Sequence, residues 1–137
     1  MSVARVSGDR GKSDVLFSRI VRSRGTCVRC GGIATDTAHI LGRVYSATRC
    51  VEDNAWSLCR GCHRVTGAHA GLFMQLVERT IREERYWELY RQAQAGIKAT
   101  GLTPLMFWRG ELQRLLIRYD ELGIAENWPK VPKTWRT

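Results

Sequence analysis

The sequence predicts an α+β fold in which a small cysteine-rich module is surrounded by several α-helices. Three observations lead to this prediction. The chain has 137 residues, the usual size of one domain with one core. Four of its five cysteines stand in two Cys-x-x-Cys pairs, which favour short turns over long regular elements. Beyond residue 71, apolar residues recur every three or four positions, as they do along one face of a helix.

The first segment, residues 1–24, is expected to be a basic arm followed by a short helix. Residues 1–12 mix basic side chains with Gly and Ser and show no apolar period, which is typical of a flexible arm. From Asp14 to Arg24 the apolar residues fit a helix, and Ser13 is a candidate for its N-cap.

Residues 25–70 are expected to form the cysteine-rich module. The stretch 33–40 is short and rich in β-branched residues, which predicts a strand or hairpin. Residues 41–54 lack a clean period and are expected to be a loop. A second short strand is predicted at 56–58, and a helix is expected to begin near the second cysteine pair.

Residues 71–123 are expected to be a helical region packed on this module. A first helical run ends near Ile81, and a second, starting at Tyr86, is a candidate for a separate helix. Thr103 followed by Pro104 gives an N-cap and a proline at the first helical position, which predicts the start of a third helix.

Residues 124–137 are expected to be a basic, aromatic and extended tail. This segment contains two prolines, which interrupt regular structure, and two tryptophans. Because an extended tail offers little core to join, we expect Trp128 and Trp135 to lie outside the core.

Composition excludes two broad classes of protein. Hydrophobic residues make up 44% of the chain and charged residues 26%, the balance of a folded globular protein. No apolar run approaches the ~20 residues needed to cross a bilayer, and the polar start from Met1 to Lys12 lacks the apolar segment of a secretion signal. We therefore expect no membrane partner and a cytoplasmic location.

The charge balance favours a polyanionic partner. Lys and Arg number 22 against 13 Asp and Glu, which gives a net charge of +9 at pH 7. Nucleic acid is the commonest partner of so basic a domain. From composition alone, a basic but inert surface is an equally good interpretation.

Two matched cysteine pairs predict a structural zinc site. Cys27 and Cys30 form the first pair, and Cys59 and Cys62 form the second. Each pair can place two thiolates on one tight turn, so the two turns can surround a zinc ion tetrahedrally. The fifth cysteine, Cys50, leaves an odd number, which argues against a framework of disulfides. We expect Cys50 to be a free, partly buried thiol and assign it no function.

Three further residues accompany the cysteine pairs: His39 and Asn54 lie between the pairs, and His63 directly follows the second pair. The surrounding sequence is CVRCGG at 27–32, AHILGR at 38–43 and EDNAWSLCRGCH at 52–63. This combination resembles the HNH endonucleases of the ββα-metal type, and in particular the phage-borne group related to NinG-type recombination endonucleases. The resemblance covers about residues 27–90, including ERYWEL at 84–89.

The resemblance implies a zinc-stapled ββα-metal module that hydrolyses DNA phosphodiester bonds. His39, at the end of the first strand, would be the general base, a role that suits an imidazole because its ordinary pKa near 6.5 leaves it mostly neutral. Asn54 would hold the opposite loop and, through its amide, orient the His39 ring. His63, at the start of the helix, would ligate a catalytic divalent ion, either Mg²⁺ or Mn²⁺.

The ligands of that second ion are not fixed by the pattern. Many HNH enzymes carry an acidic residue directly before the base, where this chain has Ala38, although NinG-like members also have a small residue there. Asp36 shares a strand face with position 38 but lies ~6.6 Å further along the strand. His69, six residues after His63, is the other candidate ligand.

Contacts to DNA are expected from Arg43 and Arg49 in the loop and from the basic arm. A phage-encoded chain would act in the cytoplasm of its host. Its oligomeric state stays open between a monomer and a homodimer, because one active site per chain can cut two strands either as a dimer or by successive nicks.

Other interpretations of the same residues remain open. His39 could be a core histidine satisfied by a backbone partner, Asn54 could cap a turn, and His63 could replace a cysteine at the zinc. The chain could then be a non-catalytic zinc-ribbon DNA-binding accessory protein, or an adaptor whose C-terminal helices bind another protein. The pair of His39 and Asn54 favours the endonuclease, since a protein that only binds DNA has no need of it.

Overall fold

The computed structural model describes residues 8–136. The strands are β1 (Asp36–His39) and β2 (Ala55–Leu58), and the α-helices are α1 (Gly8–Arg22), α2 (Arg60–Ala68), α3 (Ala70–Thr80), α4 (Glu83–Ala95) and α5 (Pro104–Glu121). Short 3₁₀ helices are η2 (Ser46–Thr48), η3 (Glu52–Asn54), η4 (Ile97–Thr100), η5 (Ile124–Glu126) and η6 (Lys133–Arg136). This mixture of helices with one small sheet confirms the predicted α+β class.

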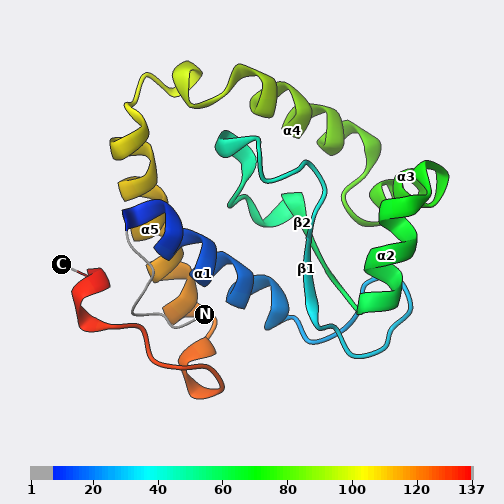
Figure 1. Ribbon diagram of the computed structural model, residues 1–137, viewed down its shortest axis with the longest axis horizontal. Helices are drawn as coiled ribbons and strands as arrows, with labels where there is room; N and C mark the ends of the chain where they lie inside the picture. Colours follow the sequence, from blue (N-terminus) through cyan, green and yellow to red (C-terminus); the bar gives the residue numbers. More distant parts are fainter. Residues whose placement is uncertain (1–7, 137) are drawn as a thin grey trace.

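The hairpin occupies the centre of the molecule (Figure 1). Helix α1 lies on one side of it, α2 and α3 lie on the other, and α4 runs across the top of the view. The two strands pair antiparallel, with Asp36 opposite Leu58 and His39 opposite Ala55. The strand predicted at 33–40 is therefore shorter, and the loop predicted at 41–54 contains η2 and η3.

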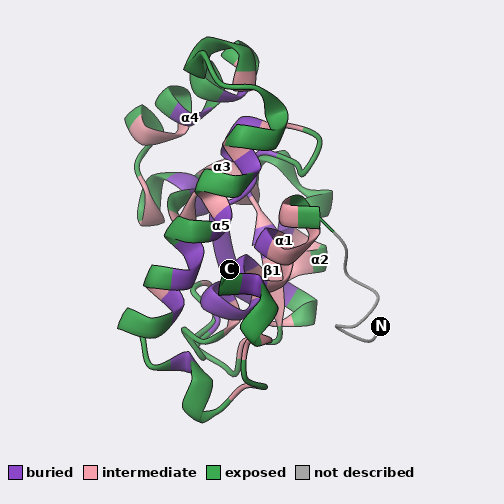
Figure 2. Ribbon diagram, turned by 90° about the vertical axis from the view of Figure 1, so that its left-hand side faces the viewer, coloured by how far each residue is buried: buried purple, intermediate pink, exposed green. Residues whose placement is uncertain are grey.

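The main core lies between α1 and α5. Figure 2 shows the buried faces of these helices turned toward each other. Their buried side chains, together with parts of the loop and tail, form one cluster: Leu16, Phe17, Ile20, Val21, Cys50, Ala55, Trp108, Leu112, Leu115, Leu116, Tyr119, Ile124 and Trp135. Thr103 accepts a hydrogen bond from the backbone N–H of Met106, which confirms the predicted N-cap of α5.

The helix α1 begins earlier than the sequence predicts. Residues 8–12 are helical, so the expected flexible arm does not extend to residue 12, and its first part, residues 1–7, lies outside the described residues. Ser13 is buried inside α1 and does not cap it. The first turn is held by α5, through an ion pair between Asp9 and Arg109 and through Arg10 over the Trp108 ring. These are tertiary contacts, which a local pattern cannot show.

The C-terminal tail is also part of the core, which corrects the expectation of an extended segment with exposed tryptophans. Trp135 is only 4% exposed, and Trp128 packs against the α1–α5 cluster with the Arg22 guanidinium stacked on its ring. Residues 124–126 and 133–136 form single 3₁₀ turns that place these rings. The prolines therefore bend the tail without keeping it away from the core.

A second core joins the hairpin to α3. It contains Trp56 and Leu58 from β2, Leu76 and Val77 from α3, and the buried cysteines of the module. The run after residue 71 does form helix α3, and the run from Tyr86 lies in a separate helix, α4, as the spacing indicated. Within residues 8–136, no helix combines the length and apolar composition that crossing a membrane requires.

Candidate metal centre and histidine pocket

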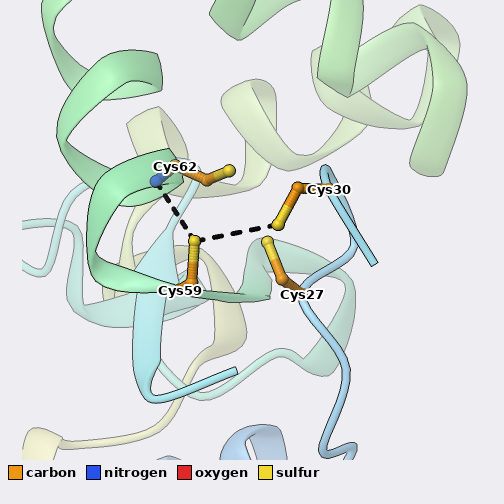
Figure 3. A group of neighbouring side chains, drawn as sticks. All are labelled: Cys27, Cys30, Cys59 and Cys62. Carbon is orange, nitrogen blue, oxygen red and sulfur yellow. Dashed lines mark hydrogen bonds between the residues drawn. The ribbon is translucent and has the colours of Figure 1, made fainter. Parts of the chain in front are cut away.

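The four paired cysteines converge on one point, as the sequence predicted. Cys27 and Cys30 lie on the turn that precedes β1, and Cys59 and Cys62 lie at the start of α2 (Figure 3). Their sulfur atoms all lie within 4.8 Å of one another, and the Sγ atoms of Cys30 and Cys59 are 3.9 Å apart. Four thiol ligands at this spacing suit a tetrahedral ion, so the cluster could hold a metal such as zinc.

Backbone geometry at each pair explains the convergence. The backbone N–H of Cys27 donates to the Gly32 carbonyl (2.7 Å), and Gly31 closes the turn with a φ of +81°, a conformation that favours glycine. At the second pair, Cys59 is the N-cap of α2, and its Sγ accepts from the backbone N–H of Cys62 at 3.4 Å. Turn and helix start thus each aim two sulfurs at the same space.

Thiol acidity differs sharply across the cluster. Burial opposes ionisation of Cys27, but backbone hydrogen bonds from Cys30, Cys59 and Arg29 outweigh it and lower its pKa to about 6. At Cys62 the Arg29 side chain favours the thiolate, yet burial and the hydrogen bonds with the other three cysteines raise its pKa to about 11. Cys27 is therefore more acidic than Cys62, and a bound cation would favour the thiolate form of Cys62 at neutral pH.

The fifth cysteine takes no part in the cluster. Cys50 lies in the α1–α5 core with 0% exposure, and burial raises the pKa of its thiol to about 12. It is a free thiol, more deeply buried than predicted. A thiol this deep and this weakly acidic is inert to oxidants and metals, which agrees with assigning it no function.

His39 lies at the end of β1 in a setting that fixes its ring. Its Nε2 is 2.9 Å from the Arg49 carbonyl, and the ring packs on Phe17 of α1 with centroids 5.5 Å apart. Because a carbonyl only accepts, Nε2 carries the hydrogen, and Nδ1 of the neutral ring is left with its lone pair. Burial, with help from the charges of Arg43 and Arg49, lowers the pKa of His39 below 6.5. The ring is therefore neutral at physiological pH.

Asn54 holds the loop, but not the imidazole. Its Oδ1 accepts from the backbone N–H of Leu41 (2.8 Å), and its Nδ2 donates to the carbonyls of Leu41 (3.1 Å) and Thr48 (3.0 Å). This side chain is fully buried, with both amide atoms bonded to backbone. The expected orienting bond to His39 is therefore absent from the structure, and the loop carbonyl of Arg49 takes that place.

His63 meets Asp36 on the α2 side of the hairpin. Its Nδ1 is 3.0 Å from Oδ2 of Asp36, whose other oxygen accepts from the Thr35 hydroxyl at 2.8 Å. The hydrogen bond from His63 is the main reason that the pKa of Asp36 lies below its usual value, so this carboxyl is ionised. Since Nδ1 donates to the carboxylate, Nε2 of His63 is the ring nitrogen left to bind a metal. Metal-binding histidines commonly use their second nitrogen in this way.

The two histidines do not share a pocket. His39 and Thr37 face α1, where they line a pocket of about 180 Å³, whereas Asp36 and His63 line another, of about 410 Å³, beside α2. This division follows from the strand, whose successive side chains point to opposite faces of the sheet. His69 lies at the junction of α2 and α3, and among residues 8–136 the cysteine cluster alone groups three or more possible metal ligands.

The two arginines expected to contact DNA differ in their surroundings. Arg49 is 8% exposed and makes two bonds to Asp14, at 2.7 and 2.6 Å, so it is not placed to reach a phosphate. This corrects the prediction for Arg49. Arg43 is exposed, lies 3.5 Å from Asp14 and lines the His39 pocket. Asp14 was not singled out in the sequence, where a lone acidic residue 35 positions from its partner gives no signal.

Comparison with protein families, with curated proteins and with solved structures finds no match to this chain.

Proposed function

We propose that the chain is a metal-dependent DNA endonuclease of the HNH type, built on a zinc-stapled ββα-metal module. The observation that carries the proposal is the setting of His39. Its ring is held through Nε2, stays neutral at pH 7 and lines an open pocket beside the exposed Arg43. A neutral imidazole with a free Nδ1 can take a proton from a water molecule, as a general base does.

The loop around Asn54 supports this role. The three bonds of Asn54 to backbone atoms fix residues 41–54, and this loop supplies the carbonyl that orients His39. Arg43 lines the same pocket as His39. Its guanidinium would bind a phosphodiester there, because its geometry matches that of two phosphate oxygens. Base and phosphate-binding group would thus act on one substrate.

The divalent ion would be held by His63, with Asp36 keeping its ring in position. Such an ion supplies charge neutralisation at a scissile phosphate and its leaving oxygen. His63 offers one nitrogen, so water and DNA oxygens would have to fill the remaining positions, which suits Mg²⁺ or Mn²⁺. The four cysteines would hold a separate, structural zinc.

One observation favours a second candidate, a non-catalytic zinc module that binds DNA. His39 and His63 line different pockets, and the bond from His39 to a backbone carbonyl is also what a structural histidine makes. A binding protein needs no shared site for a base and an ion. In such a protein the basic surface would contact DNA and the zinc centre would stabilise the fold.

Nicking of supercoiled plasmid with Mg²⁺ or Mn²⁺ separates the two candidates. We expect cleavage by the wild type and a loss of about 10²–10⁴-fold in His39→Ala and in His39→Gln. His39→Gln is the matched control, because its amide nitrogen can replace Nε2 as the donor toward the Arg49 carbonyl but is no base. DNA affinity and zinc content should be those of the wild type in both variants.

The ion-binding role of His63 has its own signature. We expect His63→Ala to lose cleavage and to regain part of it at high Mn²⁺, whereas added metal cannot replace the missing base of His39→Ala. Full cleavage by His39→Ala would overturn the mechanism. No cleavage by the wild type with any metal would establish the DNA-binding module instead.

A further inference from the structure

A third pocket lies between the first cysteine turn and α3, and neither His39 nor His63 lines it. It encloses about 420 Å³ and is lined by Arg29, Leu72, Gln75, Leu76 and Arg79. Two of these five side chains are cationic, one is an amide and none is acidic. Two guanidinium groups and an amide around one hollow make a site for an anion.

Arg29 is fixed by the cysteine cluster itself. It stands inside the first Cys-x-x-Cys turn, and its Nη1 donates to the Sγ of Cys62 at 3.5 Å. Its side chain is partly buried, so it loses little freedom on binding a ligand. A guanidinium has five N–H donors, and this bond uses one of them.

Arg79 approaches the same turn from the last turn of α3. Its Nη2 donates to the backbone carbonyls of Val28 (2.8 Å) and Arg29 (3.3 Å), which fastens α3 to the cysteine turn. These partners are neutral, so the positive charge of Arg79 is not cancelled by them. By contrast, Arg49 is neutralised by Asp14 and Arg136 by Asp120.

We propose that this Arg29–Arg79 pocket binds a backbone phosphate of duplex DNA. The ligand class rests on the proposed function and on the net charge of +9, both of which point to nucleic acid. Neither His39 nor His63 lines this pocket, so a phosphate bound there would position the duplex and would not be the one that is cut. Phosphate contacts of this kind set the register of a protein on DNA and carry no sequence preference.

The alternative to phosphate binding is that the two arginines only stabilise the cysteine cluster. A zinc ion with four thiolates carries a net charge of about −2, which Arg29 would offset through its bond to Cys62. Arg79 bonds to carbonyls and not to sulfur, and Gln75 is exposed. Changes at Gln75 and Arg79 therefore test phosphate binding without removing the Arg29–Cys62 bond.

The first test introduces a negative charge into the pocket. Gln75→Glu should weaken binding to a fluorescent DNA duplex by about tenfold at low salt, because a carboxylate would repel the phosphate. Gln94→Glu is the matched control, since Gln94 is also an exposed helical glutamine but lies on α4. Binding is measured by anisotropy without Mg²⁺ or Mn²⁺, and zinc content is measured on each variant. Equal affinities of the two variants would overturn the proposal.

The second test measures, from the salt dependence of DNA binding, whether Arg79 neutralises one phosphate. Arg79→Ala should make the salt dependence of DNA binding shallower by about 0.9 log unit per log unit of salt, whereas Arg79→Lys, which keeps the charge, should leave it unchanged. Arg91→Ala, an equal loss of charge on α4, is the control. A slope for Arg79→Ala equal to that for Arg91→Ala would also overturn the proposal.

Failure of this site and failure of the endonuclease are distinguishable. If Gln75→Glu weakens binding and the wild type never nicks plasmid, the pocket stands and the endonuclease falls. If the wild type nicks plasmid and Gln75→Glu binds DNA like Gln94→Glu, the opposite holds. An RNA duplex of the same sequence is measured in parallel, and tighter binding to RNA would overturn DNA as the ligand.

Discussion

Two regions of this molecule are held together by different means. The helical region, consisting of α1, α5 and residues 122–136, packs large side chains such as Phe17 and Tyr119 into a single apolar cluster. The cysteine region, residues 26–68, contains two strands of four residues each and a helix of nine. Its large apolar side chains, Trp56 and Leu58, pack with α3, and the four cysteines bring the first turn to the start of α2.

The two regions draw their stability from different sources. Burying one large apolar side chain contributes ~1.5–3 kcal/mol, so the helical region is stable through the sum of many contacts. A two-stranded hairpin is at best marginally stable alone. We therefore expect the cysteine region, including the Arg29–Arg79 pocket, to keep its geometry only when the four cysteines hold a metal ion.

The largest expected effect comes from breaking the metal centre. Cys27→Ser should abolish stoichiometric zinc binding and unfold the cysteine region, because structural zinc contributes on the order of 10 kcal/mol. Hydrogen exchange should then show lost protection in β1, β2 and α2, while α1 and α5 retain more of theirs. Cys50→Ser is the control and should retain its zinc, because Cys50 lies outside the cluster. A folded, zinc-loaded Cys27→Ser protein would contradict this comparison.

The next effect comes from a cavity in the helical region. Leu115 is fully buried between α1 and α5, and Leu115→Ala should lower the free energy of unfolding by about 2–5 kcal/mol. Denaturant unfolding measures the loss, and metal analysis should show a full complement of zinc. Ile117→Ala, at an exposed position of the same helix, should cost far less. Loss of zinc from Leu115→Ala would show that the two regions are not separately stabilised.

A smaller effect is expected where the regions meet, at His39 between β1 and α1. If His39 is the general base proposed above, it works only when deprotonated. Because its pKa is lowered, kcat/KM should hold its value as pH falls through 6.5 and decline only below that lowered pKa. Arg43→Ala removes one of the charges that lower it, which should move the decline to higher pH. If kcat/KM of Arg43→Ala declined at the same pH as that of the wild type, a group other than His39 would be responsible for the decline.

Sequence reasoning succeeded where the signal is local. Thr103 and Pro104 marked the start of α5, and the apolar spacing separated α3 from α4. Each of these signals lies within a few residues of the feature it predicts. The spacing of the cysteines predicted the cluster of four thiols. Cysteine pairs are the one long-range signal that is legible, because metal coordination restricts both the residue type and the spacing.

It failed where a partner comes from a distant part of the chain. Arg49 looked like a DNA contact because Asp14, which neutralises it, lies 35 residues away. The tail tryptophans looked exposed because the cluster that buries Trp135 is made by two helices separated in sequence. The separation of His39 from His63 depends on α1 covering one face of the hairpin and α2 lying beside the other, which no local pattern in the sequence indicates.

The smallest expected effect comes from an exposed ion pair in the tail. Arg136 makes two bonds to Asp120, at 2.9 and 2.8 Å, but both side chains are about half exposed. Exposed ion pairs contribute ~0–1 kcal/mol, so Arg136→Ala should shift the denaturant midpoint only slightly, and 0.5 M salt should weaken the wild type by the same small amount. The neighbouring Trp135→Ala, which empties part of the core, should cost several times more. If Arg136→Ala proved the more damaging of the two, charge and not apolar burial would anchor the tail to α5.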